Sequence, residues 1–193
     1  MIITIGGKPG SGKSTLAKLL AKKLGYAYYY MGGMRRKMAE ERGITLHQLN
    51  TLGEREEWTD KEVDEYQRTL GQREDNFVID GRTSYHFIPH ALKIFIDVNP
   101  RVGAERVLHD VQKKDEQRTD EDKGLTTVDA VMKSHDARVA SDRVRYNKYY
   151  GIDVYDTSHY DFVLDTSAYD VETSFKKLHA FVLKTLKKTK KTR

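Results

Sequence analysis

A glycine-rich segment near the start of the chain has the residue types that hold nucleotide phosphates. Gly7, Gly12, Lys13 and Ser14 fit G-x-x-x-x-G-K-[ST] within "GGKPGSGKST". The glycines let successive backbone N–H groups point inward at an anion. An apolar-periodic stretch follows and predicts a helix, whose N-terminus favours negative charge. We expect the phosphates of ATP to bind this loop through Gly7, Lys8, Pro9, Gly10, Ser11, Gly12, Lys13, Ser14 and Thr15.

Three side chains are expected to act on the transferred phosphoryl group and its metal: two from this motif and one from a later strand. Lys13 should reach the β- and γ-phosphates, and the Ser14 hydroxyl should bind magnesium. Asp80 ends the apolar run "FVID", which reads as a buried strand. An aspartate there can hold magnesium through water; the alternative is that it caps the next helix. We predict Mg²⁺ as the cofactor, held by Ser14 and Asp80.

Arginines dominate the rest of the chemistry. Arg138, Asp142 and Arg145 have the spacing i, i+4, i+7, which places them on one stripe of a helix. With Arg36 and Arg82 they could line a pocket for an anionic acceptor, since arginine binds phosphate in a bidentate manner. A phosphate acceptor near neutral pH is already mostly a dianion and needs no general base. The alternative is an exposed ion-pair ladder in which Asp142 pairs with its neighbours.

The elements that must position these residues alternate along the chain. Short apolar strands are predicted in "IITIGG", "YAYYY", "NFVIDG", "LKIFID" and "YDFVLDTS". Helices are predicted over 32–42, 45–57, 59–71, 100–110, 126–150 and 171–187. Five strands alternating with helices favour an α/β fold with a five-stranded parallel sheet covered on both faces.

Two segments interrupt the alternation. We expect a small helical insertion over 32–71, whose third helix starts at a capping box formed by Thr59 and Glu62. We expect a mobile lid over 109–125, because it contains almost no apolar residue, followed by the helix 126–150. The core then comprises 1–31, 72–108 and 151–193 of one kinase domain. Two such segments can close over two substrates.

Composition excludes several classes of protein. The chain has 193 residues, no cysteine and a net charge of +5, with a basic tail "KTLKKTKKTR". It therefore has no disulfide framework and no thiol catalysis. The tail is expected to be a solvated helix end, so nucleic-acid binding is not expected. A strand is predicted at the first residues and no apolar run is long enough to span a bilayer. We expect a cytoplasmic protein without membrane contact, acting as a monomer.

The motifs in order resemble the nucleoside monophosphate kinase family, and within it cytidylate kinase of the short archaeal type. "GGMRRKMAEERG" is similar to the acceptor helix, with Arg36 in the arginine position. "DGR" followed by "IPHALKIFID" resembles the run D-G-R…P-x-A-x-x-K-I-F-L-D. The spacing R-x-x-x-D-x-x-R and the end segments "YYGID" and "YDFVLDTS" are also similar, so the resemblance covers nearly the whole chain.

The resemblance implies a P-loop NTPase fold with an NMP-binding insertion and a lid. It implies that ATP and CMP or dCMP give ADP and CDP or dCDP. Lys13, Arg82, Arg138 and Arg145 would be catalytic, and the acceptor would be bound by Arg36, Arg82, Arg138, Asp142 and Arg145. Arg106 occupies a lid-arginine position, and Arg118 and Lys123 of the lid are expected near ATP.

The chain departs from the family pattern around the acceptor helix. Tyr30 and Met31 replace small residues, Gly33 replaces an acidic residue and Arg35 replaces an aromatic. The acceptor pocket is therefore expected to be reshaped. Several side chains could hydrogen-bond the base of the acceptor, and the sequence does not select among them: Asp64, Gln67, Arg68, Ser84 and His86.

Other functions remain open from the sequence. The acceptor could be UMP, AMP or a small hydroxylated metabolite. The chain could instead be an ATP-dependent switch or RNA-associated ATPase, or a nucleotide-binding module without turnover. An evident water-positioning residue and an aromatic RNA platform are missing, which counts against the RNA-associated alternative.

Overall fold

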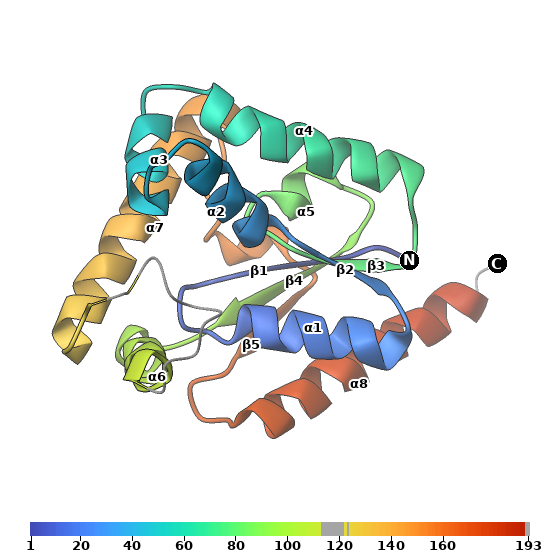
Figure 1. Cartoon of the computed structure of the whole chain (residues 1–193). Coiled ribbons are helices and arrows are strands. Elements are labelled where there is room, and N and C mark those ends of the chain that lie inside the picture. The colour runs from blue at the N-terminus through green and yellow to red at the C-terminus, as the bar shows by residue number, and fades with distance from the viewer. Residues whose placement is uncertain (113–121, 123, 192–193) are drawn as a thin grey trace.

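A parallel sheet organises the molecule (Figure 1). The computed structural model describes residues 1–112, 122 and 124–191. In this part of the chain the sheet has five strands in the order β2-β3-β1-β4-β5, and every pair of neighbours is parallel. The strands are β1 (Ile3–Gly7), β2 (Ala27–Tyr30), β3 (Phe77–Asp80), β4 (Leu92–Asp97) and β5 (Phe162–Asp165). The predicted α/β class and all five predicted strands are confirmed.

Helices connect the strands. They are α1 (Lys13–Leu24), α2 (Met31–Glu41), α3 (Leu46–Gly53), α4 (Trp58–Arg73), α5 (Ser84–Phe87), α6 (Pro100–Gln112), α7 (Val128–Tyr150) and α8 (Val171–Lys191), with a 3₁₀ turn at Thr157–His159. Every predicted helix is present, with ends that differ by a few residues. The short helix α5 was not predicted, because four residues are too few to display helical periodicity.

Side chains of β3 alternate between two apolar cores. Val78 packs with α1 and α8, whereas its neighbours Phe77 and Ile79 pack with the helices α2, α3 and α4. In Figure 1, α1 and α8 lie along one face of the sheet, and α2, α4 and α5 lie over the other. The sheet is thus covered on both faces, which explains why its strands read as continuous apolar runs.

The strand order brings the phosphate loop beside Asp80. β1 lies between β3 and β4, with Ile5 opposite Asp80 and Gly7 opposite Ile96. Because all the strands are parallel, their carboxyl ends meet at one edge. Ligands of open α/β sheets bind at this edge.

The predicted insertion corresponds to α2, α3 and α4. These helices pack together over an apolar cluster that includes Met38, Leu49 and Val63. The capping box predicted at Thr59 is wrong: α4 begins one residue earlier, and the Thr59 hydroxyl donates to the Glu56 carbonyl at 3.1 Å. A reciprocal capping box instead begins α3, between Thr45 and Gln48. The division into core, insertion and lid stays a prediction.

Much of the predicted lid lies outside the described residues. Residues 113–121 and 123, which include Arg118 and Lys123, are not described. α6 and α7 flank this segment and pack on each other through Ala104, Val107 and Val131. Among the helices that the structure describes, none combines the length and apolarity that crossing a membrane requires.

Candidate active site

A large cavity opens at the carboxyl edge of the sheet. Its volume is about 1390 Å³, which exceeds the usual range of small-molecule pockets. The whole predicted phosphate loop, from Gly7 to Thr15, lines it, as do Asp80 and the arginines Arg36, Arg82 and Arg138. The structure therefore gathers groups from β1, β3, α2 and α7 around one space.

The phosphate loop has the backbone conformation that its glycines predict. Gly12 caps α1 with a φ of 79°, and no acidic residue stands in the first turn of that helix. Gly10 has a φ of 73°, and a Cβ there would lie 2.4 Å from the carbonyl oxygen of Gly103 in α6. Only glycine meets both conditions at this position without strain. The positive end of α1 therefore faces the cavity.

Lys13 and Asp80 form an ion pair at the centre of this edge. The Asp80 carboxyl is buried, and the Tyr28 hydroxyl lies 3.4 Å from its Oδ2 atom. Ser14 lies in the first turn of α1 and lines the same cavity. A hydroxyl and a carboxylate are the hard oxygen ligands that Mg²⁺ prefers when phosphates and water complete its shell. The residues present thus fit magnesium.

Arg106 links α6 to the segment after β5. Its guanidinium donates to the Thr166 hydroxyl at 3.0 Å and to the carbonyls of Thr166 and Tyr169 at 2.7 and 3.0 Å. The Thr166 hydroxyl in turn donates to the carbonyl of Ser11 in the phosphate loop at 3.1 Å. Arg106 also lines the cavity, so it is more than a helix-surface residue.

Two predicted acceptor arginines lie on different helices that border the cavity. Arg36 of α2 donates to the Tyr30 hydroxyl and stacks over that ring, with its guanidinium carbon 5.4 Å from the centroid. Arg138 of α7 lies 3.6 Å from a carboxylate oxygen of Asp122. Both line the cavity.

Arg82 lines the same cavity and is held by Asp142 of α7. Its Nε atom is 2.6 Å from Asp142 and 3.2 Å from the Tyr155 hydroxyl, which itself donates to Asp142 at 2.7 Å. Burial alone would raise the pKa of Asp142, but Arg82 and Arg145 outweigh it and hold the pKa below its ordinary value. Asp142 is therefore an anion that orients Arg82.

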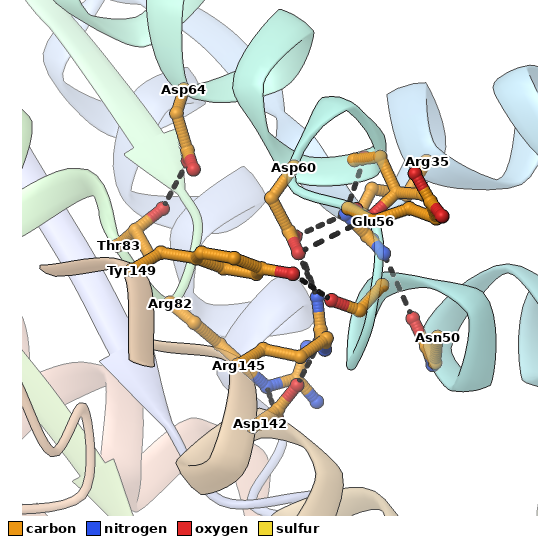
Figure 2. A network of polar contacts seen from close by, with 12 residues as sticks. Arg35, Asn50, Glu56, Asp60, Asp64, Arg82, Thr83, Asp142, Arg145 and Tyr149 are labelled. Carbon is orange, nitrogen blue, oxygen red and sulfur yellow. Dashed lines mark hydrogen bonds and ion pairs between the residues drawn. The ribbon is translucent and has the colours of Figure 1, made fainter. Parts of the chain in front are cut away.

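The predicted stripe on α7 does not face the cavity as a unit. Arg138 lines the cavity, but Asp142 and Arg145 do not, and Arg145 is 1% exposed. Arg145 donates to Asp60 at 2.5 and 2.6 Å and to Asp142 at 2.5 Å (Figure 2). The expectation that Asp142 and Arg145 face the cleft is corrected here, because buried carboxylates from two helices draw the Arg145 guanidinium inward.

The sequence did not point to two members of this network. Arg35 is buried, pairs with Asp60, and donates to the Thr59 carbonyl at 2.9 Å and to Asn50 at 3.0 Å. The only signal was that arginine stands where the related helix has an aromatic. Nothing in the spacing marked Asp60, whose partners come from elements far apart in the chain.

A second polar network borders the cavity near α4. Asp64 accepts from Thr83, Gln67 and Tyr150 at 2.8, 2.9 and 2.6 Å. Gln67 also accepts from Ser84 at 2.5 Å. Of the side chains able to read a base, Asp64 and Gln67 line the cavity, whereas Arg68, Ser84 and His86 do not.

Comparison with known proteins places the chain in a family. The model of the cytidylate kinase-like family matches residues 2–168. The chain is 35% identical to cytidylate kinase of Methanocella arvoryzae, across 89% of this chain and 91% of that protein. It is 37% identical to cytidylate kinase of Pyrococcus furiosus, across 91% and 84%.

A solved structure shows the same fold at lower identity. Shikimate kinase from Bacteroides thetaiotaomicron superposes with a TM-score of 0.60 over 94% of this chain and 98% of that one. The identity is 18%, so this likeness concerns the fold, an α/β P-loop fold. With the family model matched over most of its length and the glycine loop in place, the chain belongs to the cytidylate kinase-like family.

Proposed function

We propose that this protein transfers the γ-phosphoryl group of ATP to CMP or dCMP and releases ADP and CDP or dCDP. The observation that carries the proposal is one cavity that is lined both by the phosphate loop and by Arg36, Arg82 and Arg138. Its volume of about 1390 Å³ is larger than the roughly 300–1,000 Å³ typical of a pocket for one small ligand, which supports a site for two substrates. The family membership supports a nucleoside monophosphate as the acceptor.

The transfer would proceed by positioning and charge stabilisation. An oxygen of the acceptor phosphate forms a bond to the γ-phosphorus while the bond from that phosphorus to the β,γ-bridging oxygen breaks. Lys13 and the N-terminus of α1 offset negative charge on the donor side, and Arg82 does so where both phosphates meet. The dianionic acceptor needs no proton acceptor, so the site requires no general base.

Ser14 and Asp80 would hold the magnesium ion, Asp80 through water. When bound, the ion supplies Lewis-acid stabilisation of the donor phosphates. In the protein alone, Asp80 pairs with Lys13. Binding of the metal and phosphates would therefore give both partners new neighbours of opposite charge.

Arg145 keeps a role in this proposal, but through another residue. It fixes Asp142, and Asp142 fixes Arg82. We therefore propose that Arg145 and Asp142 position Arg82. Direct contact of Asp142 with the acceptor's sugar would require the cleft to rearrange.

The test is ADP production from ATP against a panel of acceptors. CMP and dCMP should give the highest kcat/KM, with UMP and AMP lower. Preferential use of shikimate would favour the small-metabolite alternative. Hydrolysis of ATP stimulated by RNA without an acceptor would favour the RNA-associated ATPase, and ATP binding without turnover would favour a nucleotide-binding module. Any of these three results would overturn the proposal.

A further inference from the structure

The edge strand β2 presents alternate tyrosines to opposite sides. Tyr28 and Tyr30 line the cavity and their rings stack, with centroids 6.4 Å apart and planes 11° from parallel. Tyr29, between them, points the other way and donates to Glu74 at 2.6 Å. This alternation follows from the pleat of a strand. Tyr30 thus enters the cavity on a rigid element.

Tyr30 contacts Arg36 in two ways. Its hydroxyl accepts a hydrogen bond from Arg36, and its ring lies beneath the guanidinium at 5.4 Å. An arginine side chain has several rotatable bonds, so fixing its guanidinium on a ligand costs conformational entropy. That cost is smaller when neighbouring groups already hold the guanidinium in place. A hydroxyl and an aromatic face together restrict both the position and the plane of the guanidinium.

Gly32 and Gly33 make room for the Tyr30 ring. A Cβ at Gly32 would lie 2.8 Å from the ring, and a Cβ at Gly33 would lie 2.9 Å from it. Both residues belong to the first turn of α2, the helix that carries Arg36. Glycine in a helix has an entropic cost relative to alanine. A side chain at either position would collide with the Tyr30 ring.

We propose that Tyr30 is a positioning residue that holds Arg36 for the acceptor phosphate, and that Gly32 and Gly33 are required to seat its ring. This inference rests on the proposed function. It also links two of the departures from the family pattern around this helix: a large aromatic stands at Tyr30, and a glycine stands at Gly33, where a side chain would collide with that ring.

The first experiment measures steady-state kinetics with CMP varied at saturating ATP. Tyr30→Phe keeps the ring and removes the hydroxyl. It should raise KM for CMP by about tenfold, the scale of losing a hydrogen bond to a charged group, with kcat and KM for ATP within about twofold of wild type. Tyr29→Phe is the matched control, since it removes a neighbouring hydroxyl on the opposite side, and should change none of the three constants. An unchanged KM for CMP in Tyr30→Phe would overturn the proposal.

A double-mutant cycle tests whether Tyr30 acts through Arg36. Arg36→Ala alone should raise KM for CMP more than Tyr30→Phe does. Adding Tyr30→Phe to Arg36→Ala should then have almost no further effect. Multiplicative losses would show that Tyr30 acts independently, and the positioning role would be rejected. If the wild type does not phosphorylate CMP at all, the proposed function fails first, which is a distinguishable result.

The glycines offer a second, independent test that does not require loss of the hydroxyl. Gly33→Ala should displace the ring and raise KM for CMP, although alanine favours the helix. In a Tyr30→Ala background, where no ring remains to be displaced, Gly33→Ala should leave KM for CMP unchanged. An equal effect of Gly33→Ala on KM for CMP in both backgrounds would contradict the proposal that Gly33 makes room for the Tyr30 ring.

Discussion

One guanidinium nitrogen of Arg145 donates to both carboxylate oxygens of Asp60, at 2.5 and 2.6 Å, and both side chains are almost fully buried. Asp60 also pairs with Arg35. A single carboxylate of α4 thereby joins an arginine of α2 to an arginine of α7 (Figure 2). Its removal would leave two buried cations without this anion.

Asp60→Ala is therefore expected to lower the free energy of unfolding by about 3–5 kcal/mol, the cost of breaking a buried ion pair. Urea denaturation followed by circular dichroism measures this change. Glu62→Ala on the same helix is the control. Glu62 lies 3.8 Å from Arg42 in an exposed pair, whose loss should cost less than about 1 kcal/mol. Equal losses in the two variants would show that Asp60 does not stabilise the network.

Lys13→Ala is expected to lower kcat by at least ~10²-fold, the scale of losing one preorganised electrostatic contact at the reacting group. The coupled assay with ATP and CMP measures it. Lys23→Ala, an exposed change in the last turn of the same helix, should leave kcat unchanged. Turnover near that of wild type in Lys13→Ala would exclude the proposed role of this lysine.

The fold was predictable because its signals are local. Each signal is contained in a few consecutive residues: the apolar runs that lead to Gly7 and to Asp80, and the glycine-lysine loop. Parallel pairing then follows from the alternation of strands and helices. The predicted phosphate loop and Asp80 could be placed together for the same reason, since both follow neighbouring strands.

The polar network was not predictable, because it depends on distant contacts. Spacing places Arg138 and Arg145 on one stripe of α7, but the direction of each guanidinium is decided by carboxylates on other elements. Asp60 lies 85 positions away from Arg145 in the chain. The hydrogen bonds between these two side chains form only when the fold brings α4 and α7 together. The periodicity of either helix alone does not indicate that contact.

Arg82→Ala should both raise KM for CMP and lower kcat, because its side chain lies where the two phosphates would meet. Arg82 is 25% exposed at the cavity, while Asp142 beneath it is 2% exposed. Lys133→Ala is the control on α7, since Lys133 is an exposed cation of the same helix. The control should retain both constants. An unchanged rate with CMP in Arg82→Ala would argue against phosphate contact by this arginine.

Asp64 provides a prediction about pH. Burial raises its pKa to about 6, and hydrogen bonds from Tyr150 and Thr83 only partly offset that effect. The folded pKa lies above the ordinary value of 3.8, so the native state binds the proton more tightly than the unfolded state does. The contribution of Asp64 to stability is therefore fully present below about pH 4 and is lost as the pH rises through about 6.

Comparison with Asp64→Asn isolates this contribution, because other carboxyl groups titrate equally in both proteins. Between about pH 4 and pH 7, the wild type should lose about 2–3 kcal/mol of unfolding free energy relative to Asp64→Asn. Asp142→Asn should differ from the wild type in another range: the pKa of Asp142 is lowered from 3.8, so its contribution to stability is present above about pH 4 and is lost only as the pH falls further. A difference between wild type and Asp64→Asn that stays constant over this range would mean that Asp64 titrates as an ordinary carboxyl group and carries no desolvation cost.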